Sequence, residues 1–338
     1  MTEPQTFQEA ILYFADPDRC IEYLAARRWP DGKVVCPTCG RDDVAFLKNQ
    51  RRWQCKSVHK HRQFSVKVGT VMEDSAISLE KWLPAIWAIV SNKNGISSWE
   101  LHRAIGVTQK TAWFMLHRIR LGMSLQKKFG TTKKIGGGSE GGPVEVDETF
   151  VGGRLKNMHK SRRARFAAES GHAGGPTGKT VVMGMLDREA RQVRAYVIPN
   201  VKRETLQAEI LSNVKYGSTV YTDDATGYEG VRNRFVHDVI NHATEYVRGQ
   251  VHTNGIENFW SLLKRGLRGT YVAVEPFHLD RYIDEQVFRF NNRATKENPL
   301  TDADRFDLAL SQIANKRLTY AELTGKTAEG AWRTPEAF

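Results

Sequence analysis

The chain has 338 residues, of which 40% are hydrophobic and 26% charged, and its 50 Lys and Arg outnumber 38 Asp and Glu to give a formal net charge of +12. The apolar fraction excludes an intrinsically disordered chain, and the length allows two or three domains but not more. The positive surplus favours a nucleic-acid partner, because Lys and Arg beside phosphates release condensed counterions; the alternative is a basic protein that is merely soluble.

No basic start followed by an apolar run is visible, and no stretch approaches 18 consecutive apolar residues. We therefore expect neither a signal peptide nor a membrane-spanning helix, and a cytoplasmic, nucleoid-associated protein without a membrane partner. In such a reducing compartment, closely spaced cysteines bind metal more often than they form disulfides.

Residues 1–30 form a predicted N-terminal helical segment. Apolar residues recur at helical spacing over 7–29, with a turn or a new helix start at Asp16-Pro17-Asp18. Cys20 lies on this amphipathic stretch, where a small buried hydrophobe is the better interpretation of it.

Residues 31–72 form a predicted zinc ribbon. Cys36 and Cys39 have the C-x-x-C spacing of a zinc knuckle, and Cys55 begins a second knuckle. Structural zinc requires four tetrahedral ligands, so we expect the fourth from His59, at C-x-x-x-H spacing, or else from His61. Alternating residues at 43–47 and 52–55 suit short strands around the metal. The competing hypothesis is that three incidental thiols remain in a domain that has decayed.

Residues 73–126 form a predicted helix-turn-helix region. An apolar helical pattern covers 79–90, and residues 97–113 show two helices joined at Gly106, the second of them capped by Thr108. Gln109 and Lys110 open that second helix and are expected to face a DNA groove. An ordinary helical hairpin is the alternative. Residues 127–143 then form the clearest boundary, because the Gly-rich run 136–143 is typical of a flexible linker that cannot pack a core.

After this linker the periodicity changes to that of strands, which we predict over 144–151, 181–187, 193–198, 218–222 and, weakly, 235–239. Helices are predicted over 204–214, 254–267 and 279–290. Three consecutive strands, a helix, another strand and later helices indicate a mixed α/β domain of RNase-H type over 144–294, so the whole chain is a multidomain α+β protein. A helical tail is predicted over 295–338, and four of its apolar residues are expected to pack on the core: Leu308, Leu310, Ile313 and Leu318.

Two acidic residues lie where metal-dependent chemistry is expected. Asp147 interrupts an otherwise apolar strand, where a charge is costly unless it is paired or binds metal; a surface acid on an edge strand is the alternative. Asp223 closes the strand 218–222, and strand ends in open α/β sheets bind ligands. We prefer it to Asp224 because it continues the register of the strand. Side chains alternate along a strand, so Glu148 is expected on the face opposite to Asp147.

Glu257 is the third candidate acid. It lies on the predicted helix 254–267, beside the apolar stripe, and Lys264 follows two turns later. This helix can therefore present an acid to metal and a cation to phosphate; a solvated pair of charges within one helix is the common alternative. Two-metal phosphoryl transfer needs such carboxylates, converging from separate elements, to hold Mg²⁺ or Mn²⁺.

The segment 156–179 between the first two strands is basic and contains Arg162, Arg163 and Arg165. Beside Asp147 it is predicted to clamp DNA phosphates and to become ordered on binding, and a solvated loop is the alternative.

Over nearly its whole length the chain resembles bacterial insertion-sequence DDE transposases, in the branch that combines an N-terminal zinc ribbon with an RNase-H-like catalytic core of ISXO2 type. The stretch 252–265 is the most specific part of this resemblance. The other motifs that carry it are residues 63–70 (QFSVKVGT), 146–149 (VDET) with Gly152-Gly153, 221–223 (YTD) and 290–293 (FNNR).

The resemblance implies that Asp147, Asp223 and Glu257 bind two catalytic Mg²⁺ or Mn²⁺ ions and that Lys264 contacts transposon-end DNA. Some relatives have Asn in place of the third acid, so a share of this role for Asn254 stays open. His252 is expected either to hydrogen-bond a phosphate or carboxylate or to be structural. His242 matches a family position without an assigned role.

The resemblance further implies a transposase that binds terminal inverted repeats through its zinc ribbon and helix-turn-helix. It would cleave the transposon end to expose a 3′-hydroxyl and join that hydroxyl to target DNA. The expected partners are double-stranded DNA and further copies of the chain in a synaptic complex, with Zn²⁺ as a structural metal. The alternatives are a DNA-binding regulator or silenced transposase without cleavage activity, and a structure-selective nuclease, which the dedicated N-terminal recognition region disfavours.

Overall fold

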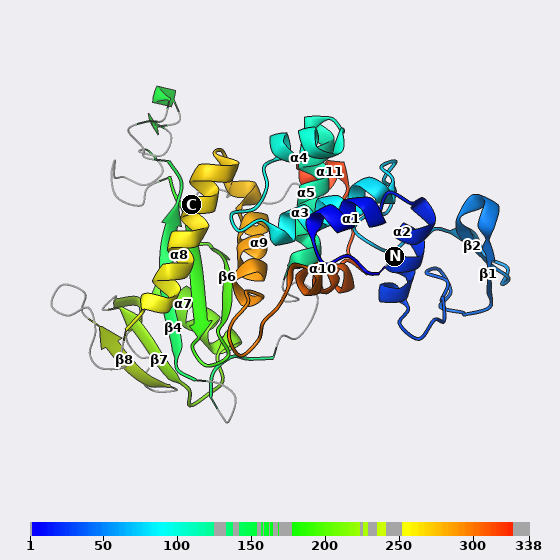
Figure 1. Cartoon of the computed structure of the whole chain (residues 1–338). Coiled ribbons are helices and arrows are strands. Elements are labelled where there is room, and N and C mark those ends of the chain that lie inside the picture. Colours follow the sequence, from blue (N-terminus) through cyan, green and yellow to red (C-terminus); the bar gives the residue numbers. More distant parts are fainter. Residues whose placement is uncertain are drawn as a thin grey trace. The chain divides into compact units, whose positions relative to one another are not determined.

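The structure, a computed structural model, describes residues 2–124, 133–137, 142–153, 157, 159–161, 163, 164, 168, 178–223, 226–228, 235–240 and 252–326. The described chain divides into two compact units (Figure 1). One combines the residues up to Ser124 with the tail from Asn292 to residue 326, and the other lies between Leu125 and Asn291. Within the described residues, none of the helices has the length and apolar character that crossing a bilayer requires.

The first unit is mostly helical, and its helices begin where the sequence supplies caps. Thr6 forms a capping box with Glu9, Asp16 caps a helix with Pro17 at its first position, and Ser97 forms a capping box with Glu100. The helices are α1 (Phe7–Tyr13), α2 (Pro17–Arg28), α3 (Leu79–Ser91), α4 (Ser98–Ile105), α5 (Gln109–Met123), α10 (Asp302–Ser311) and α11 (Tyr320–Leu323).

Helices α4 and α5 lie where the sequence predicts the helix-turn-helix. Gly106 ends α4 in the left-handed conformation, at φ 62°, and the Thr108 side chain accepts a hydrogen bond from the backbone N–H of Thr111 at the start of α5. A left-handed residue costs a glycine little, which explains Gly106 at this turn.

The zinc-ribbon segment forms a small antiparallel sheet in the order β1-β2-β3. Its strands are β1 (Val44–Leu47), β2 (Arg52–Cys55) and β3 (Gln63–Phe64), with the short 3-10 helix η1 (Lys48–Gln50) between the first two. Trp53 of β2 stacks on Phe64 of β3, with 6.1 Å between ring centroids. The strands are very short, so this sheet buries only a small apolar core, to which the aromatic pair contributes.

The C-terminal tail packs with the N-terminal helices and belongs to the first unit. Phe306 of α10 is fully buried and lies 4.8 Å from the Trp87 ring of α3 and 5.6 Å from that of Phe14, between ring centroids. Leu310, Ile313 and Leu318 are buried as predicted, and Leu308 is half-buried. Sequence order alone does not reveal this partner, because the contacts join segments that are more than 200 residues apart.

We expect Phe306→Ala to destabilise the first unit by about 3–5 kcal/mol, the usual cost of removing a buried aromatic ring. The free energy of unfolding, followed by tryptophan fluorescence, measures this effect. Phe277→Ala is the matched control, because Phe277 is 47% exposed and should change stability by less than about 1 kcal/mol. A small effect of Phe306→Ala would show that the tail does not stabilise these helices.

The second unit is built on a five-stranded sheet in the order β6-β5-β4-β7-β8. Strands β4, β5 and β6 form an antiparallel meander, while β7 and β8 run parallel to β4. This arrangement confirms the predicted RNase-H-like fold. The strands are β4 (Val144–Val151), β5 (Thr180–Asp187), β6 (Gln192–Ile198), β7 (Thr219–Asp223) and β8 (Val236–Ile240). The helical elements are α7 (Arg203–Asn213), η4 (Thr226–Tyr228), α8 (Asn254–Gly266), η6 (Leu267–Tyr271), η7 (Pro276–His278) and α9 (Leu279–Asn291).

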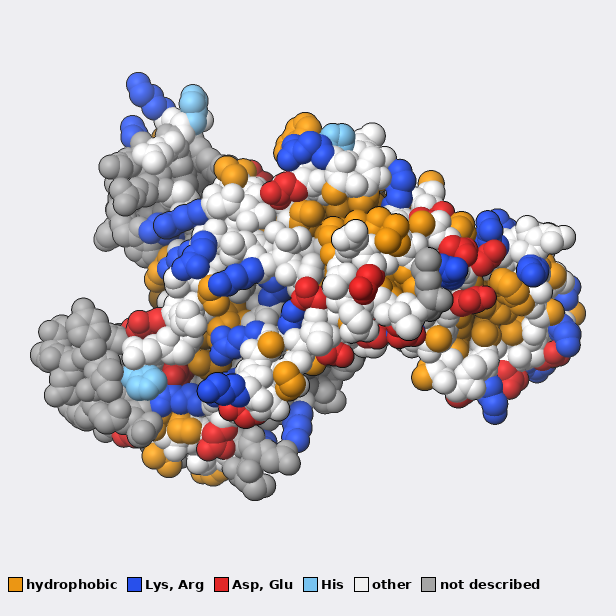
Figure 2. Space-filling view, in the orientation of Figure 1, with side chains coloured by type: hydrophobic (Ala, Val, Ile, Leu, Met, Phe, Trp, Pro, Cys, Tyr) orange, Lys and Arg blue, Asp and Glu red, His pale blue; other side chains and the backbone are white. Residues whose placement is uncertain are grey.

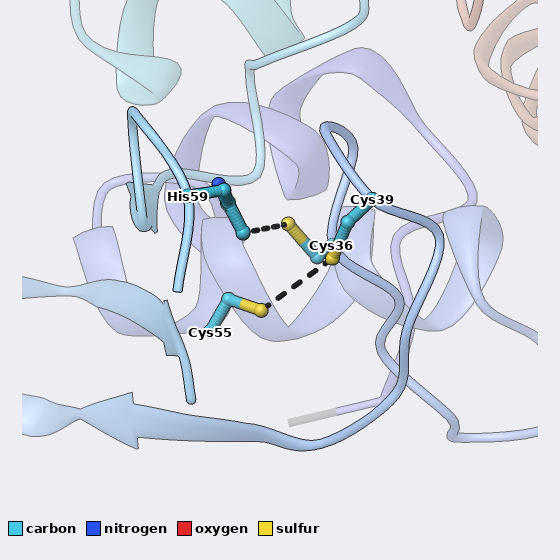
Figure 3. Close-up of side chains that lie close together, drawn as sticks. All are labelled: Cys36, Cys39, Cys55 and His59. Atoms are coloured by element: carbon cyan, nitrogen blue, oxygen red, sulfur yellow. Dashed lines mark hydrogen bonds between the residues drawn. The ribbon is translucent and has the colours of Figure 1, made fainter. Parts of the chain in front are cut away.

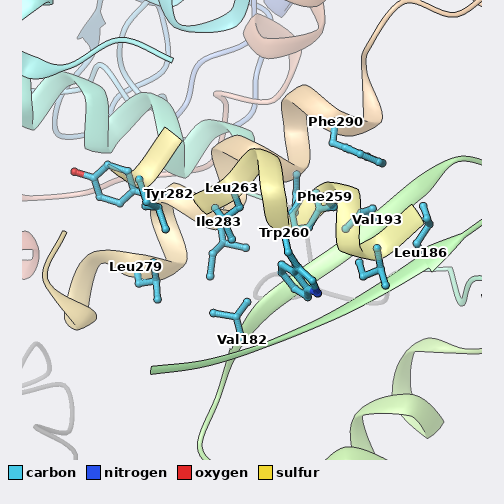
Figure 4. Close-up of a cluster of buried hydrophobic side chains, with 14 residues drawn as sticks. Val182, Leu186, Val193, Phe259, Trp260, Leu263, Leu279, Tyr282, Ile283 and Phe290 are labelled. Carbon is cyan, nitrogen blue, oxygen red and sulfur yellow. The ribbon is translucent and has the colours of Figure 1, made fainter. Parts of the chain in front are cut away.

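Helices cover both faces of this sheet, and strand alternation assigns each side chain to one of them. Val182 and Leu186 of β5 pack against α8 and α9, in the cluster drawn in Figure 4. Met183 and Met185 pack on the opposite face with α7 and with Val144 and Val146 of β4. The odd-numbered residues 145 and 147 of β4 therefore face α8, as two-residue periodicity requires.

The linker prediction is wrong for residues 133–137. Ile135 is buried in the core beneath α7 and forms a β-bridge with Val214. The backbone N–H of Gly136 donates to Asp187 Oδ2 at 2.8 Å. These residues belong to the sheet unit, because the buried Ile135 side chain, the β-bridge to Val214 and the hydrogen bond from Gly136 hold this glycine-rich segment in place. Several predicted positions lie outside the described residues: Arg162, Arg165, Asp224 and His242.

Candidate catalytic and zinc sites

Asp147 and Asp223 lie level with each other on neighbouring parallel strands. The paired residues of β4 and β7 are Val144 with Val220 and Glu145 with Tyr221, and the pairing ends there. Asp147 lies two residues after Glu145 on β4, and Asp223 lies two residues after Tyr221 on β7. Both carboxylates therefore project from the same face of the sheet.

The Asp147 carboxylate is held by two donors. Trp260 Nε1–H of α8 donates to Oδ2 at 2.9 Å, and the backbone N–H of Glu148 donates to Oδ1 at 2.8 Å. Burial raises the pKa of Asp147 to about 6, and the negative charges of Asp223 and Glu257 act in the same direction while these donors oppose it. The three predicted acids therefore share one electrostatic environment.

Glu257 lies in the first turn of α8 and is exposed. The Thr253 hydroxyl donates to its Oε1 at 3.1 Å. Asn254, the first residue of α8, is also exposed. Trp260, one turn after Glu257, contacts Gly184 of β5, where a Cβ atom would lie 2.5 Å from the indole ring.

A group of cations lies beside the acids. Burial, together with the positive charges of Arg268 and Lys179, lowers the pKa of Lys264, while the negative charge of Asp147 opposes this shift. Figure 2 shows Lys and Arg side chains gathered over the region of α8. The acid and the cation expected on one helix are thus close to the same aspartate, and Lys179 and Arg268 are neighbours that sequence reasoning did not identify.

Glu148 is a fourth carboxylate near this cluster, on the α7 face as predicted from strand alternation. The Tyr228 hydroxyl donates a hydrogen bond to it. Burial raises the pKa of Glu148 to about 7, and the negative charges of Asp147 and Asp223 contribute to the rise. Sequence reasoning gave Glu148 no role, although two consecutive acids in an apolar strand were the available signal.

The carboxylates suit a divalent cation by their chemistry. Hard oxygen donors are the preferred ligands of Mg²⁺ and Mn²⁺, and a cation would relieve the charge repulsion that adds to the effect of burial on these pKa values. Among the described residues, though, only the cysteine cluster has three or more ligand atoms all within 4.8 Å of one another. The acids are therefore grouped more loosely than the zinc ligands.

The predicted zinc ligands come together at one point of the ribbon (Figure 3). Cys39 Sγ lies 3.6 Å from Cys55 Sγ, and Cys36 Sγ lies 3.5 Å from His59 Nε2. Tetrahedral zinc with ordinary bond lengths separates such ligand atoms by about 3.6–3.8 Å, so the cluster fits the metal. His61 is not part of the group.

Two features prepare these side chains to bind zinc. His59 Nδ1 lies 2.7 Å from the Lys60 carbonyl, which can only accept, so the proton is on Nδ1 and the Nε2 lone pair faces the thiols. Burial opposes ionisation of Cys55, but its neighbours His59 and Ser57 lower the pKa of its thiol to about 6. The thiolate is the form that zinc requires.

The residues predicted to reach DNA from α5 have partners within their own unit. Gln109 Nε2 donates to Ser98 Oγ at 2.8 Å, and the Lys110 ammonium lies 4.7 Å from the centre of the Tyr320 ring. Lys110 remains exposed, whereas α5 is buried from Met115 to its end. Lys110 is the only exposed residue of this helix, which the structure describes throughout. In the predicted basic loop, residues 156–179, the described residues 160, 161, 163 and 164 are helical, and Arg163 is exposed.

Comparison with known proteins gives two matches along the chain. The family model described as an ISXO2-like transposase domain matches residues 140–291, and the one described as a transposase zinc-ribbon domain matches residues 16–61. Together they cover more than half of the chain. It belongs to the zinc-ribbon ISXO2-like transposases. A relative from Halobacterium salinarum, a protein of the transposable element ISH50, is 27% identical over 262 residues, which is 75% of this chain and 84% of the relative.

The two matches confirm the family and the zinc ribbon that the sequence predicts. The sheet unit of this transposase contains the domain of a nuclease-type enzyme family. The matched ranges contain all three acids and all four candidate zinc ligands. They do not reach α4 and α5, so the DNA-binding helix-turn-helix stays a prediction.

Trp260→Phe removes the N–H donor to Asp147 while it keeps a large ring against Gly184. We expect the pKa of Asp147 to rise further and, under the function proposed below, the Mn²⁺ concentration for half-maximal DNA cleavage to rise about 10-fold. Trp82→Phe, which removes an indole bond to Ser75 in the first unit, is the matched control. An equal effect of both substitutions would contradict a specific role for Trp260.

Proposed function

We propose that this transposase cleaves DNA at transposon ends in a reaction that depends on Mg²⁺ or Mn²⁺ and then joins the exposed 3′-hydroxyl to target DNA. The observation that carries the proposal is the level placement of Asp147 and Asp223 on adjacent strands, with Glu257 in the same electrostatic environment. The cation Lys264 next to these acids supports it, because the reaction takes place at a phosphodiester.

In this proposal Asp147, Asp223 and Glu257 hold two ions, and Asn254 is placed to assist at the start of α8. Bound divalent cations supply a Lewis acid that activates the attacking oxygen and stabilises the leaving one. In the cleavage step, a bond forms between a water oxygen and phosphorus and the bond from phosphorus to the 3′ oxygen breaks. The water gives up a proton, and the 3′ oxygen takes one up as a hydroxyl. Lys264, with Arg268 and Lys179, neutralises the charge of the phosphate.

The DNA partner and the assembly belong to the same proposal. The zinc ribbon over 31–72 and the helix-turn-helix over 73–126 would bind terminal inverted repeats, and the catalytic domain over 144–294 would act on the ends they deliver. The net charge of +12 supports a polyanionic partner. Joining two ends to one target requires more than one active site, so we propose a synaptic complex of two or more copies.

Neutralising the basic loop tests its predicted contact with DNA. Replacing Arg162, Arg163 and Arg165 together with Gln should weaken binding to end DNA and reduce the slope of log affinity against log salt by about 3, one for each lost phosphate contact. Fluorescence anisotropy over a series of salt concentrations gives this slope. An unchanged slope would exclude a phosphate clamp in this loop.

The proposed activity is tested by incubating the purified full chain with DNA that carries a transposon end, with Mg²⁺, Mn²⁺ or EDTA. We expect strand cleavage at the end only when metal is present, followed by joining to a second duplex. Binding of end DNA without cleavage under all metal conditions would favour the regulator or silenced transposase.

A further inference from the structure

Glu145 is a buried carboxylate two residues before Asp147, and its role in the domain is not explained by the proposed chemistry. It is 1% exposed and lies on the face of β4 that α8 covers. Its Oε1 accepts a hydrogen bond from Arg188 Nε at 2.5 Å, and its Oε2 accepts from the backbone N–H of Ile256 at 2.8 Å. A buried charge is tolerated only when it is paired in this way, so its position is tightly constrained.

The bond to Ile256 completes the start of α8. The first N–H groups of any helix lack partners within the helix, and a Ser, Thr, Asp or Asn side chain just before it usually accepts one of them. The residue in that position is Thr253, but its side chain makes no such bond and donates instead to Glu257. The strand residue Glu145 therefore supplies the cap that the local sequence does not, and its negative charge suits the positive end of the helix.

The approach of α8 to the sheet at this point is close. Gly255, the residue before Ile256, faces Glu145 and Leu186, and a Cβ atom there would lie 2.9 Å from Glu145 Oε2 and even nearer to the Leu186 side chain. Only glycine fits between the helix backbone and the strands without displacement. The contact thus sets the separation between α8 and β4.

Arg188 balances the charge of Glu145 and joins the surrounding elements. It donates to Nδ1 of His252 at 2.7 Å and to the His252 carbonyl, just before α8, and its guanidinium lies 4.7 Å from the centre of the Tyr221 ring of β7. Tyr221 is the β7 residue that pairs with Glu145 in the sheet. Because an arginine can only donate, His252 Nδ1 accepts, and these contacts favour the structural alternative for His252.

Two bonds attach α8 to β4, and their spacings match. Glu145 and Asp147 are two residues apart on a strand, about 6.7 Å, while Ile256 and Trp260 are four residues apart on a helix, about 6 Å. The helix therefore lies along the strand with one attachment at each end of a single turn. Glu257 lies within that turn.

We infer that Glu145, paired with Arg188, is a positioning residue that holds the first turn of α8 on β4 and so fixes the third metal ligand, Glu257, relative to Asp147. The role of Glu257 as a metal ligand in this inference rests on the proposed function. The attachment of α8 to β4 does not rest on it. In this inference Glu145 acts through the helix backbone, by its bond to the Ile256 N–H.

Glu145→Gln tests the inference in the full chain, because Gln has one acceptor oxygen for the two donors, Ile256 N–H and Arg188 Nε. We expect faster hydrogen exchange of the backbone amides at 255–260 and about 10-fold weaker binding of Mn²⁺, measured by electron paramagnetic resonance without DNA. Gly255→Ala should do the same from the helix side without a change of charge. Asp187→Asn is the matched control, since Asp187 is equally buried but accepts from Gly136 and Gly142, away from α8.

Amide exchange and Mn²⁺ affinity that stay at the levels of the unmutated protein in both Glu145→Gln and Gly255→Ala would overturn the inference. The same losses in Asp187→Asn would also overturn it, because they would show a general loss of stability. Asp147→Asn separates the two questions. If it binds Mn²⁺ as well as the unmutated protein, the proposed function is wrong, whatever the exchange of α8 shows.

Discussion

Asp147→Asn is expected to abolish strand cleavage and at the same time to stabilise the metal-free protein at pH 8. The activity loss follows from the removal of a ligand in a reaction where bound metal contributes several kcal/mol, so we expect a fall of at least about 10³-fold. The opposite effect on stability follows from the pKa of Asp147, which burial raises from 3.8 to about 6. At pH 8 the folded protein must carry a buried charge that the unfolded chain carries in water.

The pH dependence has a definite direction. A carboxyl whose pKa is higher in the folded state favours folding below its unfolded pKa, and this contribution is lost as the pH rises through about 6. For Asp147, the difference between the pKa of the unfolded chain and that of the folded protein corresponds to at most about 3 kcal/mol of stability. Glu148, with its pKa raised to about 7, acts in the same direction. Metal-free protein should therefore be less stable at pH 8 than at pH 5, and Asp147→Asn should reduce that difference.

Chemical unfolding at pH 5 and pH 8 without added Mg²⁺ or Mn²⁺, in buffer that leaves zinc bound, together with the cleavage assay, measures both effects. Asp238→Asn is the control, because Asp238 is an exposed acid on β8 and should alter neither activity nor stability at pH 8. Cleavage by Asp147→Asn at the normal rate would remove Asp147 from the site. A loss of stability at pH 8 would contradict the buried charge as the reason for its raised pKa.

Removal of zinc is expected to unfold the ribbon. Three strands of two to four residues bury a small core, so the free energy of zinc binding, about 10–16 kcal/mol in small zinc domains at neutral pH, is the main source of its stability. We expect one zinc per purified chain. Cys36→Ser and His59→Ala should each lose most of that zinc together with the binding of end DNA.

Zinc quantification by elemental analysis, with circular dichroism before and after chelation, checks this prediction. His61→Ala is the control for His59, since His61 is not part of the cluster, and Cys20→Ser is the control for Cys36, since Cys20 is buried in α2. Unchanged zinc content in His59→Ala would identify a different fourth ligand. Loss of zinc in His61→Ala would show that the cluster differs from the four residues described.

Many elements of this transposase were predictable because their signals lie within short windows of sequence. The alternation of Val144 to Val151 predicts a strand and places Glu148 opposite Asp147. The spacing of Cys36 and Cys39, with Cys55 and His59, predicts the zinc ligands that the structure brings together. Thr108 and Gly106 predict the turn between α4 and α5, because capping and the left-handed conformation depend on single residues.

Other features depended on contacts between distant residues. The sequence indicated a linker where Ile135 enters the sheet core, and it did not indicate that Phe306 completes the core of the N-terminal helices. The linker was misjudged because glycine content reports backbone freedom in the unfolded chain, whereas neighbours in the fold decide whether that freedom is lost. The packing partner of the tail was not predicted, because an amphipathic helix shows which face it buries but not which partner covers that face.

The sequence by itself determined the family, the order of the strands along the chain and the candidate acidic, thiol and cationic residues of the two sites. Only the tertiary structure decided that Asp147 and Asp223 are level on neighbouring strands, that Tyr228 approaches Glu148, and that Glu145 caps a helix 111 residues away. The physical reason is the range of each interaction. Caps, turns and alternation act over a few residues, whereas strand pairing and buried charge pairs act between elements that only folding brings together.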